Sequence, residues 1–120
     1  IGYVPCFIRF PGGSSNTISA SYTKGIMTTL TQEVQARGYQ YYDWNGDTTD
    51  ASGNHIPTAT IIKQATSETH QNIVLLAHDT DAKDTTVAAL PSIIQYYKEK
   101  GYQFLGIDDE SYYVHHDIQN

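Results

Sequence analysis

Short apolar runs alternate along the chain with longer segments in which apolar residues recur every three or four positions. Runs of four to eight residues are typical of buried strands, whereas the longer spacing is typical of helices. The runs are 5–10, 39–43, 73–77 and 102–107, and the helical segments are 24–37, 57–66 and 85–100. A strict alternation of strands and helices implies parallel strands with right-handed crossovers. The pattern therefore predicts an α/β fold, either a barrel or an open sheet.

Glycine and proline mark the ends of the expected helices. Gly38 and Gly101 follow the first and third helices, where glycine is a natural C-terminal cap. Pro57 opens the second helix. Pro91 is compatible with the third helix if it occupies a first-turn position, because proline there removes no needed hydrogen bond.

Three of the expected strands end in polar residues that are suited to chemistry. Arg9 ends the first strand and is followed by the Pro-Gly-Gly of 11–13, whose backbone can approach a ligand closely. Asp47 and Asp50 lie in the loop after the second strand, and His78 directly follows the third. In parallel β/α folds the loops at the carboxyl ends of strands build the site. Arg9, Asp47, Asp50 and His78 are therefore the candidate residues of a functional site.

The net charge of the chain limits which classes of binding partner are plausible. Thirteen acidic residues against seven basic ones give a net charge of −6, which disfavours nucleic acid and anionic membranes and leaves neutral polymers plausible.

Cys6 is the single cysteine, so no intrachain disulfide can form, and a buried, inert thiol is expected. No apolar run approaches the roughly 18 residues that a membrane-spanning helix needs.

In the order and spacing of these polar residues along the chain, the sequence resembles the NodB-like polysaccharide deacetylases, carbohydrate esterase family four. The family's Arg-x-Pro motif is similar to residues 9–13. Its Asp-x-x-Asp-Trp motif, after a strand that ends in Trp, is similar to Trp44 and 47–50, although Ala51 replaces the usual Trp. Its Leu-x-His motif is similar to 76–78. The resemblance runs over nearly all 120 residues.

This resemblance implies that residues 1–120 are the C-terminal part of the catalytic NodB homology domain. The implied fold is about four β/α units of a distorted seven-stranded barrel. The implied parent enzyme is a hydrolase of amide C–N bonds, which removes acetyl groups from an N-acetylated polysaccharide such as peptidoglycan or chitin. It would act outside the cell or at the bacterial cell surface.

The same resemblance implies a divalent metal of the Zn or Co type in the parent enzyme. The family's metal ligands lie upstream of the Arg-x-Pro motif, so we expect this chain not to hold that metal and to be inactive alone. Its expected partners are the acetylated polysaccharide and either the missing N-terminal half of the domain or another copy of the chain.

The resemblance also implies a role for each candidate residue. His78 would be the general acid that protonates the leaving amine, with Asp47 as the carboxylate beside it. The backbone N–H of Gly12 would stabilise the oxyanion. Arg9 would pair with a catalytic-base aspartate that this chain lacks. The candidates for substrate binding are Trp44 and Leu76.

Each assignment has a structural alternative. Arg9 could be a surface residue at a strand end, and His78 could be a structural histidine. Asp47 and Asp50 could be turn residues in a loop rich in Asn, Gly and Thr. For Trp44, a wall or core position is favoured over a sugar platform.

Three other functions are weighed against the deacetylase. The first is a non-catalytic carbohydrate-binding or structural half barrel. The second, a glycosidase that uses Asp47 and Asp50, is disfavoured because carboxylates three positions apart in one Gly-rich loop have no reason to flank a sugar from two sides. The third is metal binding by the acidic residues of 106–110 together with residues 115–117. The alternative for these residues is a polar tail with adjacent histidines that point in different directions.

Overall fold

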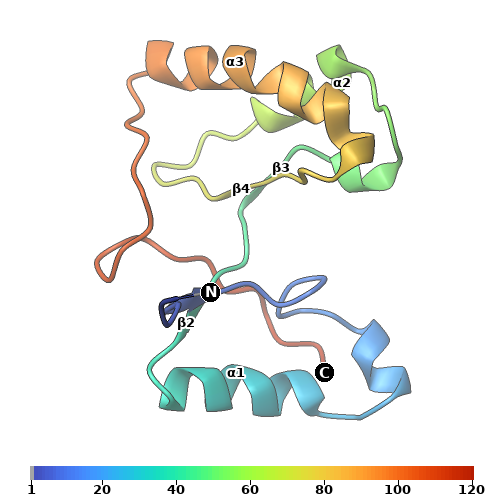
Figure 1. Cartoon of the computed structure of the whole chain (residues 1–120), viewed down its shortest axis with the longest axis vertical. Helices are drawn as coiled ribbons and strands as arrows, with labels where there is room; N and C mark the ends of the chain where they lie inside the picture. The colour runs from blue at the N-terminus through green and yellow to red at the C-terminus, as the bar shows by residue number, and fades with distance from the viewer. Residues whose placement is uncertain (1) are drawn as a thin grey trace. The chain divides into compact units, whose positions relative to one another are not determined.

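The computed structural model describes residues 2–120, which form two compact units (Figure 1). The first unit contains the residues up to Trp44 together with Asp109–Asn120, and the second unit is Asn45–Asp108. Each unit contains one pair of parallel strands, and neither sheet closes. The predicted α/β class is therefore confirmed.

The first unit is a β-α-β arrangement. Strand β1, Phe7–Ile8, pairs in parallel with β2, Gln40–Tyr41, and helix α1, Ile26–Ala36, connects them. Phe10, Met27 and Tyr41 form its buried core, in which the rings of Phe10 and Tyr41 lie 5.3 Å apart. A connecting helix is what a parallel strand pair requires, because a hairpin cannot return the chain in the same direction.

The second unit repeats this arrangement and adds a helix. Strand β3, Gly46–Asp47, pairs in parallel with β4, Leu75–Leu76, through helix α2, Thr58–Ala65. Helix α3, Asp84–Glu99, packs along α2, as the upper part of Figure 1 shows. The core residues come from both helices: Ile61, Ala65, Ala89, Ile93 and Tyr97. None of the helices in the described residues is long and apolar enough to cross a membrane.

Two predicted strands differ from the structure. The run 39–43 forms only the short strand β2, because at Asp43 the backbone N–H donates to the carbonyl of Val114 instead of to β1. The run 102–107 is not a strand, and within residues 2–120 no strand pairs with it. Its side chains Phe104 and Leu105 are exposed, so they are not packed as the side chains of a buried apolar strand would be.

Two smaller predictions are also wrong. Pro91 lies inside α3 and not in its first turn. It is tolerated because the carbonyl of Val87, which loses its N–H donor, belongs to a residue that is 57% exposed and can bind water. Cys6 is exposed and not buried, because neither hydrophobic core cluster packs against it.

Tyr97 ties the two helices of the second unit together. Its buried hydroxyl donates to the carbonyl of Ala65 at 2.6 Å, at the C-terminal end of α2, where carbonyls lack helical partners. Tyr97→Phe leaves this acceptor without its donor, and we expect a loss of about 1–2 kcal/mol in unfolding free energy by urea denaturation. Tyr96→Phe is the control, and equal losses for the two variants would contradict the assignment.

Candidate functional site

In the second unit, the structure brings His78 together with Asp50. The His78 ring, directly beyond β4, places Nδ1 at 2.8 Å from Oδ1 of Asp50, and the backbone N–H of His78 donates to Oδ2 at 2.8 Å. The Asp50 side chain is 1% exposed, whereas that of His78 is 30% exposed. A buried carboxylate thus holds a histidine that solvent can reach.

The charge of Asp50 fixes the proton on the His78 ring. Burial raises the pKa of Asp50, but hydrogen bonds from the ring and backbone of His78 and from the Thr86 hydroxyl outweigh it, so the pKa lies below its usual value. An ionised carboxylate only accepts hydrogen bonds, so Nδ1 of His78 must carry the proton. Nε2 is then the ring atom that can exchange a proton with a reacting group.

The structure corrects the role predicted for Asp47. Its Oδ1 accepts a hydrogen bond from the backbone N–H of Thr49 at 2.7 Å and does not contact His78. Asp47 is the last residue of β3, and its side chain closes the turn that follows. This turn carries the next carboxylate, Asp50, to the His78 ring. Leu76 is half-buried in β4, beside Asp47 in the strand register.

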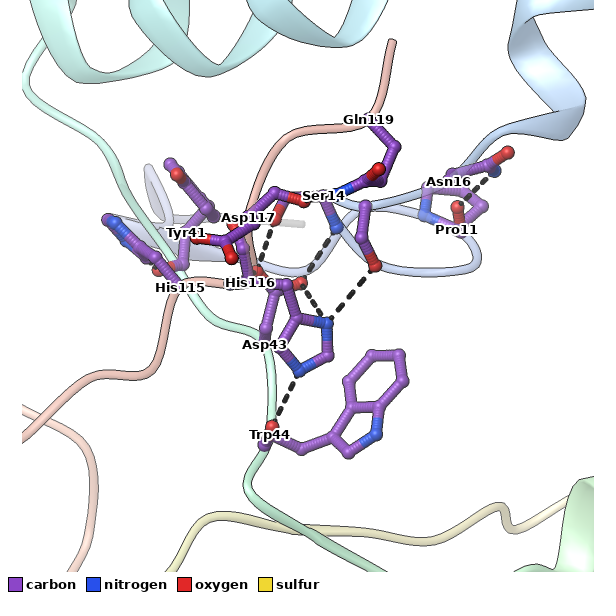
Figure 2. A network of polar contacts seen from close by, with 11 residues as sticks. Pro11, Ser14, Asn16, Tyr41, Asp43, Trp44, His115, His116, Asp117 and Gln119 are labelled. Atoms are coloured by element: carbon purple, nitrogen blue, oxygen red, sulfur yellow. Dashed lines mark hydrogen bonds and ion pairs between the residues drawn. The ribbon is translucent and has the colours of Figure 1, made fainter.

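In the first unit, the buried carboxylate of Asp43 is hydrogen-bonded to two other segments of the chain, at Ser14 and at His116. Asp43, which is 1% exposed, accepts hydrogen bonds from the backbone N–H of Ser14 at 2.7 Å, from the Ser14 hydroxyl, and from the backbone N–H of His116 at 2.8 Å. Figure 2 shows these side chains pointing toward one another. Burial raises the pKa of Asp43, but these hydrogen bonds outweigh it and lower the pKa below its usual value.

His116 connects this network to Trp44. Its Nε2 lies 2.6 Å from the carbonyl of Trp44, which can only accept, so Nε2 carries a proton. Nδ1 lies 3.3 Å from the hydroxyl of Ser15. The indole and imidazole rings meet edge to face, with centroids 4.8 Å apart (Figure 2). Trp44 is half-buried and is held in place at both its backbone and its ring.

The loop after β1 depends on its two glycines. Gly12 and Gly13 have φ angles of +72° and +80°, which favour glycine. A Cβ at Gly13 would lie 2.9 Å from the Trp44 ring and 3.1 Å from Oδ1 of Asp43. Arg9, before this loop, is exposed, and none of the ion pairs between described residues involves it.

Sequence reasoning missed Asp43, Ser14 and the packed position of His116. The C-terminal histidines were considered as a metal site or as part of a polar tail in which adjacent histidines point in different directions. The two rings do contact different partners, but both are partly buried. His115 stacks on the Tyr41 ring with centroids 3.7 Å apart, while His116 lies against Trp44. Within residues 2–120 no group of three His, Cys, Asp or Glu side chains could hold a metal.

Comparison with known proteins finds several similar proteins that are named as deacetylases. No protein-family model matches it. It is 41% identical to the catalytic domain of a peptidoglycan N-acetylglucosamine deacetylase from Eubacterium rectale, with a TM-score of 0.92, over 99% of this chain and 54% of that chain. The polysaccharide deacetylase Bc1974 from Bacillus cereus is 31% identical, with a TM-score of 0.74, over 95% of this chain and 53% of that chain.

The chain is a relative of the polysaccharide deacetylases. It is also 31% identical to the peptidoglycan-N-acetylglucosamine deacetylase of Bacillus cereus, over 94% of this chain and 40% of that protein. The resemblance inferred from the motifs is thereby confirmed. The chain spans about two fifths of the length of the curated polysaccharide deacetylases that it matches, 38% in one case and 40% in another.

Proposed function

We propose that the chain contributes the proton-donating residues of a polysaccharide N-deacetylase that acts on an N-acetylglucosamine polymer such as peptidoglycan. The observation that carries this proposal is the His78 ring held by the buried, ionised Asp50. Relatives with deacetylase names cover nearly the whole chain and support it. The fold proposed for the parent domain is a distorted β/α barrel, of which this chain would be about four β/α units.

Amide hydrolysis requires a proton at the leaving nitrogen. Water adds to the acetyl carbonyl, a tetrahedral oxyanion forms, and the C–N bond breaks as the amine takes up a proton. A doubly protonated His78 donates that proton from Nε2, while Nδ1–H remains bound to Asp50. Because Asp50 stays ionised, it stabilises the imidazolium and keeps the ring in one orientation.

Other parts of the reaction are assigned by resemblance. The backbone N–H of Gly12 is proposed for the oxyanion, Arg9 for a carboxylate outside the chain, and Trp44 and Leu76 for the sugar. The divalent metal that the family implies does not fit the residues described here, since 2–120 offer no group of three ligands. We therefore propose that the 120-residue chain alone is inactive with added Zn²⁺ or Co²⁺, and that the complete enzyme acts at the cell surface or outside the cell.

The test is acetate release from N-acetylglucosamine oligomers by the full-length natural protein that contains this chain. His78→Gln is expected to lower kcat by about 10²-fold or more, the usual contribution of a general acid. His70→Gln, at an exposed histidine of the same unit, is the control and should leave kcat unchanged. Unchanged turnover in His78→Gln would overturn the assignment, and glycan binding without acetate release would favour a carbohydrate-binding function instead.

A further inference from the structure

Lys83 is a buried cation that the proposed reaction does not use. It ends the 3₁₀ turn Asp81–Lys83, directly before α3, and is 9% exposed. Its Nζ donates to the carbonyls of Asp50 and Gly53, both at 2.6 Å. None of the ion pairs between described residues includes it. A buried ammonium is costly unless it is hydrogen-bonded, so these two contacts account for its position.

The loop that Lys83 binds is strained at the residue before Asp50. Thr49 has a φ of 58°, a left-handed conformation that is rare for a β-branched residue. Such strain persists only where surrounding contacts hold it. Asp47 binds the N–H of Thr49 on one side of the loop, and Lys83 binds the carbonyls of Asp50 and Gly53 on the other. Lys83 therefore supplies donors that the turning backbone cannot supply itself.

Thr86 holds the carboxylate of the same aspartate. Its hydroxyl donates to Oδ2 of Asp50 at 2.9 Å, and Thr86 is 2% exposed in the first turn of α3. This is the oxygen that also accepts the backbone N–H of His78. With Oδ2 bound twice, the carboxylate cannot rotate, and Oδ1 stays aimed at the His78 ring.

We infer that Lys83 and Thr86 are positioning residues for the proton donor His78, which they orient through Asp50. Lys83 fixes the backbone of Asp50 and Thr86 fixes its carboxylate, so that together they determine where the imidazole points. Neither residue needs to touch substrate. This inference rests on the proposed deacetylase function for its kinetic test, but not for its spectroscopic test.

The chain offers matched controls for both residues. The hydroxyl of Thr85 is buried without a partner in the described structure, whereas that of its neighbour Thr86 binds Asp50. Thr85→Val and Thr86→Val thus remove the same group, and only the second removes a contact to the site. Lys63→Met, at an exposed position of α2, is the control for Lys83→Met.

In the full-length natural protein, Lys83→Met and Thr86→Val are each expected to lower kcat by about tenfold or more. KM should stay within about threefold of the wild-type value. The reason is that misplacing a catalytic group by a fraction of an ångström acts on the transition state. Thr86→Ser should restore most of kcat, and the two controls should match wild type. Melting temperatures show whether each variant is folded. Losses in kcat no larger than in the controls would overturn the inference, and if Lys83→Met does not fold, Thr86→Val and its serine rescue decide.

A second measurement does not depend on turnover. The ¹⁵N shifts of the His78 ring, assigned by comparison with His78→Gln, report which nitrogen carries the proton in the neutral imidazole. Wild type and controls are expected to hold it on Nδ1, and Lys83→Met and Thr86→Val should show a mixture of tautomers. If the wild-type full-length protein releases no acetate but the tautomers change as expected, the proposed function fails and the positioning role stands. Identical ring shifts in all variants would refute the positioning role.

Discussion

Asp43→Asn is expected to destabilise the protein by about 3 kcal/mol, because the substitution leaves a buried backbone N–H facing an amide donor. The carboxylate accepts two backbone N–H groups, one at each oxygen, from Ser14 and His116. Asparagine has the same shape but only one acceptor oxygen. The Ser14 hydroxyl can reverse and accept from the new amide, but a backbone N–H cannot. One of the two must lose its partner.

The pH dependence of stability gives an independent check on Asp43. Its pKa is lowered in the folded protein, so its stabilising contribution is fully present above the unfolded-state pKa of about 3.9. That contribution is lost as pH falls through the lower folded-state pKa. The stability of Asp43→Asn should therefore fall less than that of wild type on acidification below about pH 4.

Urea denaturation at pH 7 and at acidic pH measures both effects. Asp117→Asn, an exposed carboxylate of the same C-terminal segment, is the control and should change unfolding free energy by no more than about 0.5 kcal/mol. If Asp43→Asn and Asp117→Asn have the same urea midpoint, the hydrogen bonds to the Asp43 carboxylate contribute little to stability, and the prediction is wrong.

The sequence predicted the helices well because their signals are local. The spacing of Ile26, Leu30 and Val34 and the glycine at position 38 fix α1 to within about two residues, the usual uncertainty of helix boundaries. The strands were harder, because a strand exists only where a second strand pairs with it. The run 102–107 is apolar, and the described structure still forms no strand there.

The contact between His78 and a carboxylate was predicted with the wrong aspartate. His78 was identified at the end of a strand, yet its partner was expected to be Asp47. The choice between Asp47 and Asp50 depends on the left-handed turn at Thr49, which a sequence rich in Asn, Gly and Thr allows but does not specify. Asp43 was missed because its partners, Ser14 and His116, lie 29 and 73 positions away in the chain.

One pair of substitutions separates the roles of Asp47 and Asp50. If the proposed deacetylase function holds, Asp50→Asn in the full-length natural protein is expected to lower kcat for acetate release by about 10²–10³-fold, within the range that general acid catalysis contributes. An asparagine at this position can accept from Nδ1 of His78 or from the backbone N–H, but not from both, and it no longer stabilises an imidazolium. The ring loses both its fixed orientation and its counter-charge.

Asp47→Asn should change kcat by less than about threefold, because an asparagine side-chain oxygen accepts the Thr49 N–H as well as a carboxylate does. Both variants lose one negative charge in the same loop, so a general electrostatic effect would act on both alike. Equal losses at the two positions, or a larger loss at Asp47, would show that Asp50 does not control the proton donor. A loss at Asp50 alone, with melting temperatures that show both variants folded, identifies the buried carboxylate as the group that makes His78 an acid in this protein.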